Sequence, residues 1–548
     1  MRLNKIIALA LACGISSAAY ALEADPFDMG NVQVVGKDAQ SADISQTNYN
    51  ITFGMTDKSI PVPDLTPEME SLTYKPMTEK PTIANIHKEN KNEFSAALGL
   101  GNKKANEIIL NGKGSNENYN ADVIILRESR DGYKSNVDTE RTGIKARVSS
   151  KNDEITTISG GAEIFDDKFA LRSTDNAINT GMDANAKLSN DNKRIWINGD
   201  STLENGAFLK AYAKIDVLNR EVENEAGFRD GQDVKSYRIG ANYKNRIDDK
   251  TKANATLDLK REELDSDIGK NISFTKFVAA GGVTHEFSSK TEAGAGIKAL
   301  KLKGTDKLSP YFNVTYRPDE AWKLSLGYEE DLGNDSLETV FLPKRYVDSL
   351  NLDYKASKLK TFKTSVDYRT PEGNHIGLDL FSQKENNAIE YFDLENFNNQ
   401  KVLSSHINFT DAKRQGITLR GEFTFEKYFT ISLKGTAQSP KCEHGGYMSY
   451  EPKKILDVGL NYTKDKFMID FTRRAEYDRK AYVGSFGGNI AYLDASDYSR
   501  SDLAVRYKIN DKFTGYLKIR DLYDEAKKIR KDVSEEGRLT MAGVEMHF

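Results

Sequence analysis

Six histidines and two cysteines are the side chains of this chain best able to do acid–base, nucleophilic or metal chemistry. Residues 285–288 (His-Glu-Phe-Ser) and 404–406 (Ser-Ser-His) each place a histidine near a serine, but neither shows a third group that would orient the base. Residues 442–444 (Cys-Glu-His) supply a thiol and an imidazole, and two such ligands do not make a zinc site. The simpler interpretation is that these histidines, serines and the cysteine are ordinary polar residues of loops or of the protein interior. The sequence therefore predicts no catalytic residue, no cofactor and no metal site, which argues against an enzyme.

A set of aromatic residues in the C-terminal part of the chain offers the best candidates for ligand contact. They lie in segments that read as long surface connections: Tyr447, Tyr450, Tyr482, Phe486 and Tyr492. Aromatic rings beside polar groups suit the vestibule of a small-molecule site. The same rings could instead pack against one another within the loops. Both interpretations stay open, and no residue pattern specifies the small-molecule substrate.

The last eleven residues, 538–548, have the alternation of a strand that separates two environments. Counting back from Phe548, every second residue could face lipid: Met546, Val544, Ala542 and Thr540. The residues between them are mostly polar or small. This period, ending on an aromatic, is typical of the closing strand of a bacterial outer-membrane barrel. Phe548 is then the signal for the barrel-assembly machinery, and an edge strand of a soluble sheet is the alternative.

The first 21 residues have the pattern of a secretory signal peptide. Arg2 and Lys5 are followed by an apolar stretch and by the cleavage pattern Ala-Tyr-Ala at 19–21. Acylation at Cys13 is a second interpretation, although it would leave a very short apolar core. Beyond this segment no run of 18 apolar residues occurs, which excludes helical membrane spans. We expect export to the outer membrane of a Gram-negative bacterium.

The composition suits a large polar barrel. The chain is 38% hydrophobic and 29% charged, and its mean hydropathy is −0.61. In a membrane barrel every second strand residue faces a wet interior, which explains such polarity, although several soluble domains would have it too. The net charge of −4 gives no basic excess for nucleic acid. Cys442 is the only cysteine after residue 21, so the mature chain forms no internal disulfide.

Residues 22–92 differ from the rest of the chain. Half of the twelve prolines fall within 22–90, and proline removes hydrogen-bond donors from a sheet. We interpret 22–92 as an extended periplasmic or lumenal segment. Residues 31–36 (Asn-Val-Gln-Val-Val-Gly) form a short β-prone run within it, able to add as a strand to a partner's sheet. A local strand without special meaning is the alternative.

Residues 93–548 read as repeated hairpins. Strands of about ten residues alternate between apolar and polar side chains and are separated by short turns rich in Asp, Asn and Lys. Longer connections alternate with these turns and are expected to face the exterior, for example 218–233, 332–359, 438–452 and 476–499. We predict an all-β fold, a transmembrane antiparallel β-barrel of about 22 strands surrounded by outer-membrane lipid.

Three passages resemble the barrel of the TonB-dependent outer-membrane receptors. They are residues 521–524 (Asp-Leu-Tyr-Asp) with 537–538 (Gly-Arg) and the terminal strand; residues 381–389 with Asn408, Ala412 and Gly416; and residues 316–328. Asp521 stands where the family usually has Asn, and Thr418 where it has Glu. The resemblance covers 308–548, and the earlier strands match only as a generic barrel.

The resemblance implies uptake of a nutrient or metal chelate through the barrel. It also implies that Val32, Gln33, Val34, Val35 and Gly36 are a box that contacts a TonB-type energising protein. The family carries a folded plug before its barrel, and residues 22–92 are short for one, so the plug is expected to be absent or reduced. A passive porin or structural barrel without energy coupling is the alternative function.

Overall fold

The computed structural model describes residues 91–548 with short gaps. The gaps are 116–118, 132–138, 151–155, 173–184, 204–205, 225–228, 268, 303–304, 334–336, 338–353, 356, 372, 395–404, 427, 444–445, 485–489, 496, 524–527, 531–532 and 535–536. The predictions for the signal peptide, for the segment 22–90 and for Val32–Gly36 lie outside the described residues. In the part that is described, no helix is both long and apolar enough to cross a membrane.

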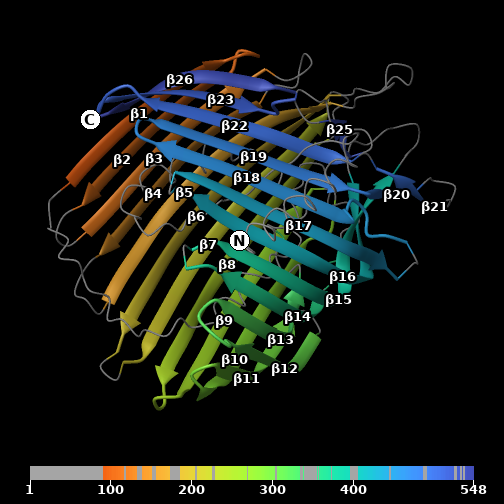
Figure 1. The fold of residues 1–548 in the computed structure, drawn as a ribbon. Coiled ribbons are helices and arrows are strands. Elements are labelled where there is room, and N and C mark those ends of the chain that lie inside the picture. Colours follow the sequence, from red (N-terminus) through yellow and green to blue (C-terminus); the bar gives the residue numbers. More distant parts are fainter. Residues whose placement is uncertain are drawn as a thin grey trace.

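Antiparallel strands that follow one another along the chain make up the wall of the barrel (Figure 1). They are β1 (Lys91–Gly101), β2 (Asn106–Ser115), β3 (Tyr119–Arg130), β4 (Thr139–Ser150), β5 (Thr156–Arg172), β6 (Asn185–Thr202), β7 (Phe208–Asn224), β8 (Arg229–Arg246), β9 (Thr251–Ser266), β10 (Ile272–Ser288), β11 (Thr291–Leu302), β12 (Thr305–Tyr316), β13 (Trp322–Gly333), β14 (Ser357–Arg369), β15 (His375–Leu394), β16 (Ser405–Phe425), β17 (Phe429–Cys442), β18 (Lys454–Lys464), β19 (Phe467–Tyr477), β22 (Tyr498–Lys508), β23 (Phe513–Arg520) and β26 (Leu539–His547).

The main sheet holds 24 strands, of which β20 (Lys480–Gly484) and β21 (Ile490–Asp494) form a hairpin outside the wall. The other 22 close the barrel, because β26 pairs with β1 from Ser95↔His547 to Gly101↔Met541. A separate two-stranded sheet joins β24 (Lys528–Arg530) to β25 (Val533–Ser534). The predicted all-β barrel of about 22 strands is confirmed, and its first strand begins two residues before the expected boundary at 93.

Alternating side chains give each wall strand an apolar outer face and a polar inner face. In β26, Val544 is 41% exposed on the outside, whereas Met541 and Glu545 are buried on the inside. In β16, Leu419 is 52% exposed and Arg414 is buried. The predicted faces of the terminal strand are therefore confirmed. Such a sheet can have no free edge in lipid, which is the physical reason for closure.

The links between wall strands are short at one end of the barrel. There, turns of two to five residues join β2–β3, β4–β5, β6–β7, β8–β9, β10–β11, β12–β13, β14–β15, β16–β17, β18–β19 and β22–β23. The short Asp-, Asn- and Lys-rich turns expected from the sequence are found at this end, for example at 248–250, 318–320, 464–466 and 510–512. The opposite end carries every long link, up to the 334–356 connection between β13 and β14. We call these the turn end and the loop end.

The prediction of a long connection over 218–233 is wrong. Here β7 runs to Asn224 and β8 begins at Arg229, and the two strands pair from Phe208↔Lys244 to Glu223↔Arg229. Several wall strands are likewise longer than the ten residues expected, with β15 and β16 having 20 and 21. Outside the apolar band both faces of a strand are polar, so the sequence of such an extension looks like a loop although its backbone continues the ladder.

The seam between β26 and β1 relies on small residues. Gly99 and Gly543 are register partners, and Tyr516 of β23 lies beside both of them. At the turn end the Phe548 N–H donates to the Phe94 carbonyl at 2.8 Å, and their rings lie 5.7 Å apart. The terminal aromatic thus joins the last strand to the first and is 73% exposed toward the outside. Its role as an assembly signal stays a prediction.

Gly543→Ala is expected to lower the free energy of unfolding by about 1–3 kcal/mol through overpacking. A Cβ at this position would overlap the Leu98 carbonyl oxygen and the Tyr516 ring, and the backbone atom cannot move aside cheaply. Gly281→Ala is the matched control, since a Cβ there meets nothing within 4 Å. Urea unfolding in detergent should separate the two variants, and equal stabilities would contradict the role of the glycine pair.

Candidate functional site at the loop end

The aromatic residues singled out from the sequence lie close together at the loop end. Tyr482 of β20 and Tyr492 of β21 place their rings 5.0 Å apart. The Tyr492 hydroxyl lies 3.1 Å from the thiol of Cys442, a buried residue at the end of β17. The hairpin also pairs in parallel with the far end of β15, at Phe392↔Tyr482. Four elements thus converge around one buried cluster.

Tyr447 and Tyr450 belong to the same assembly, in the link between β17 and β18. Tyr450 is 4% exposed, its N–H donates to the Lys480 carbonyl at 2.6 Å, and the Arg479 guanidinium lies 5.6 Å from its ring. The Lys453 ammonium lies 4.2 Å from the Tyr447 ring. Phe486 lies outside the described residues.

Packing between loops therefore accounts for Tyr450 and Tyr482, the second of the two interpretations offered by the sequence. Burial raises the pKa of Tyr482, and burial together with the hydrogen bond to Cys442 raises the pKa of Tyr492. Both phenols stay neutral at physiological pH and act as hydrogen-bonding groups. Contact of these side chains with a ligand stays a prediction.

Arg414 fixes this loop assembly to the barrel wall. From the inner face of β16 its Nε and Nη2 donate to both carboxylate oxygens of Glu451, at 2.8 and 2.6 Å. Its Nη1 donates to Glu385 of β15 at 2.8 Å. All three side chains are less than 10% exposed. Glu451 belongs to the same link as Tyr450, so a buried, bidentate ion pair determines where that link sits.

A second link, between β13 and β14, also packs against the inner wall at the loop end. Tyr354, from the connection between β13 and β14, stacks on Phe274 of β10 with ring centroids 4.4 Å apart. The N–H of Leu337, from the same connection, donates to the buried Glu262 carboxylate of β9 at 2.8 Å. Both link residues join an apolar cluster on the inner wall with Leu218 and other strand residues. Residues from two links thus pack against the inner wall at the loop end.

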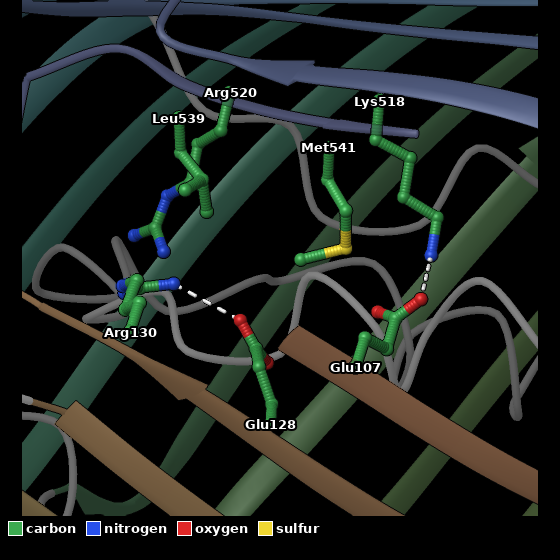
Figure 2. A pocket seen from close by; sticks show the side chains of 7 residues that line it. All are labelled: Glu107, Glu128, Arg130, Lys518, Arg520, Leu539 and Met541. Carbon is green, nitrogen blue, oxygen red and sulfur yellow. Dashed lines mark hydrogen bonds and ion pairs between the residues drawn. The ribbon is translucent and has the colours of Figure 1, made fainter. Parts of the chain in front are cut away.

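A charged pocket lies at the inner side of the seam, near the loop end (Figure 2). The Lys518 ammonium of β23 donates to Glu107 of β2 at 2.7 Å, and the Tyr516 hydroxyl donates to the same carboxylate at 3.0 Å. Arg130 donates to Glu128 at 3.0 Å within β3. Arg520, Leu539 and Met541 complete the lining. The pocket can offer both signs of charge to a group that enters from the barrel interior.

A family model described as TonB dependent receptor-like, beta-barrel, matches residues 94–522. That span exceeds half of the chain and covers most of the wall. The chain belongs to the TonB-dependent receptor-like barrel family. This is a family of receptors rather than of enzymes, and the resemblance drawn from three short passages is confirmed.

Solved structures with the TonB-dependent receptor-like fold are similar in backbone but distant in sequence. The FrpB iron transporter from Neisseria meningitidis has a TM-score of 0.66 at 12% identity, over 84% of this chain and 82% of that one. The pyoverdine receptor FpvA from Pseudomonas aeruginosa has 0.65 at 12%, over 84% and 79%. The copper transporter OprC has 0.64 at 13%, over 84% and 81%. No curated protein matches by sequence.

Sequence reasoning missed the ion pairs that organise this receptor-like barrel. Arg414 lies within the passage that carried the family resemblance, yet its partner Glu451 is 37 residues away. Glu107 and Lys518 are 411 residues apart and meet only because the barrel closes. Strand alternation could have placed these side chains on the inner face, but it carries no information on which inner residues become neighbours.

Proposed function

We propose that the chain is an outer-membrane receptor that takes up a nutrient or metal chelate through its barrel. The observation that carries the proposal is the family match over 94–522 on a closed barrel of 22 strands. Iron, ferric pyoverdine and copper are named for proteins of similar fold, which supports a small chelated substrate as the class. The aromatic assembly at the loop end is where such a ligand would first be captured.

In this proposal residues 1–21 are removed on export, 22–92 form an N-terminal segment that gates the lumen, and the barrel follows. The run Val32–Gly36 contacts a TonB-type protein by adding a strand to it, and that contact supplies the energy for uptake. Lipid of the outer membrane surrounds the wall, and the barrel-assembly machinery inserts it. The lumen of so wide a barrel stays open unless an element blocks it, and we assign that role to residues 22–92.

Conductance across a planar bilayer tests this function. The mature protein is expected to be closed, and removal of residues 22–90 is expected to open a large channel, because an unplugged barrel of 22 strands has a wide lumen. Val34→Pro in the otherwise complete protein is the matched variant: it removes a backbone donor needed for strand addition, so it should abolish TonB binding without opening the channel.

Equal conductance with and without 22–90 would overturn gating by this segment. A passive porin built on a receptor-like barrel would then be the better description. If the full-length channel is closed and Val34→Pro binds TonB as the wild type does, gating by 22–90 is supported. The assignment of Val32–Gly36 as the TonB-contacting box is then rejected. The two parts of the proposal therefore fail separately.

A further inference from the structure

Four lysines stand opposite one another across four neighbouring strands of the wall. The register pairs Lys360 of β14 with Lys384 of β15, Lys384 with Lys413 of β16, and Lys413 with Lys441 of β17. These strands lie side by side in Figure 1. Adjacent strands are about 4.8 Å apart, so the four residues form a line about 14 Å long. We call them the lysine row.

The lysine row faces outward. Along β15 and β16 its members share a face with Leu380 and Leu419, which are 50% and 52% exposed, while the alternate residues Glu385 and Arg414 are buried inside. Lys384, Lys413 and Lys441 are themselves exposed. The side chains therefore project from the same surface as the apolar band of the wall, and away from the barrel interior.

The height of the row matches the edge of a bilayer. At the turn end of β16, Phe425 is 43% exposed and its ring lies 6.2 Å from that of Phe429, as expected for an aromatic girdle at the interface. Lys413 is 12 residues further along the strand. At about 3.3 Å per residue and a tilt of about 40°, this gives about 30 Å, the thickness of a hydrocarbon core. The row then lies at the headgroups of the opposite leaflet.

Three of the four lysines have no ion-pair partner among the described residues. Lys360 alone is paired, with Glu330 at 3.4 Å. Glu385 follows Lys384 but is buried on the inner face, and the next acidic residues, Asp411 and Glu443, lie two residues beyond the row toward the loops. Asp411 instead accepts a hydrogen bond from the Asn386 side chain at 2.5 Å. Like charges directly opposite on adjacent strands are destabilising, so the row is unfavourable without an added anion.

We propose that the lysine row binds the phosphate groups of anionic lipid headgroups in the outer leaflet. Long lysine stems reach along an apolar surface while the ammonium stays at the polar level, which is the placement found here. Several lysines in a line would contact adjacent phosphates and relieve the repulsion within the row. The proposal requires the outer-membrane placement given above but is independent of substrate, gating and coupling to TonB.

The test compares the mature wild type with the triple variant Lys384→Gln, Lys413→Gln, Lys441→Gln. In neutral detergent the variant should unfold at the same temperature as the wild type or a higher one, because the repulsion is gone. Phosphatidylglycerol added to the micelles should raise the Tm of the wild type above that of the variant, reversing the order. Native mass spectrometry should show that phosphatidylglycerol binds the variant roughly 100-fold more weakly than the wild type, because three lysine contacts are lost.

A matched control removes the same number of charges from the turn end. Lys250→Gln, Lys290→Gln, Lys512→Gln changes three exposed turn lysines and should respond to phosphatidylglycerol as the wild type does. Phosphatidylcholine of the same acyl chains should not discriminate among the proteins. Equal phosphatidylglycerol affinity in the row variant and the wild type would overturn the proposal. A Tm rise produced equally by inorganic phosphate would also overturn it, since the row would then be a site for soluble anions.

Discussion

Arg414→Met should lower the free energy of unfolding of the barrel by about 3–5 kcal/mol. The guanidinium makes three charge-assisted hydrogen bonds to Glu385 and Glu451, and all three side chains are buried. Methionine fills a similar space but leaves two carboxylates facing one another without a cation. Loss of the anchor should also free the link that carries Tyr450. Urea unfolding and limited proteolysis of the 443–453 link would measure the two effects.

A triple variant separates the missing charge from the missing volume. Glu385→Gln, Arg414→Met, Glu451→Gln removes every charge of the network and should recover most of the stability, because a neutral replacement of a buried ion network is often tolerated. The link should remain sensitive to protease, since its bidentate anchor is still absent. If the single and triple variants were equally unstable, packing around Arg414 rather than its charge would be responsible. Wild-type stability of the single variant would show that the network does not hold the link.

Lys518→Met should destabilise the barrel by a comparable amount, about 3–5 kcal/mol, and at a different place. Glu107 is then left buried inside the seam, where the Tyr516 hydroxyl still donates a hydrogen bond to it. This pair joins β23 to β2 across β26 and β1, so its loss acts on the closure of the sheet. Hydrogen exchange should rise first in β1 and β26, while amides in β8 and β9 on the far part of the wall stay protected.

A double variant that removes both charges of the Glu107–Lys518 pair is the comparison for Lys518→Met. Glu107→Gln with Lys518→Met leaves no buried charge and should recover most of the stability, as Tyr516 can still donate to the amide oxygen. Lys235→Met is a control at a solvent-exposed pair, with Asp265 3.8 Å away, and should change stability by less than about 1 kcal/mol. A double variant no more stable than Lys518→Met alone would argue against the ion pair as the cause.

The local alternation of the chain was enough to determine the class of fold. Residues 538–548 specify two faces without reference to any other strand, and the structure places Val544 outside and Met541 inside as that pattern requires. Short turns such as 510–512 identify one end of the barrel for the same reason, because a hairpin turn is a local structure. The extensions of β7 and β8 were missed where the outward face lost its apolar signal.

The tertiary structure alone decided which side chains meet. Glu107 and Lys518 are partners because the first and last strands close a ring, and Arg414 reaches Glu451 because a link folds back into that ring. The lysine row exists only in one register: a shift of β15 by one residue would turn Lys384 inward. Alternation along a strand is set by the geometry of one chain segment, whereas register and closure are set by the sum of all pairings. The sequence therefore determined the faces of the wall, and the closed sheet determined the sites on them.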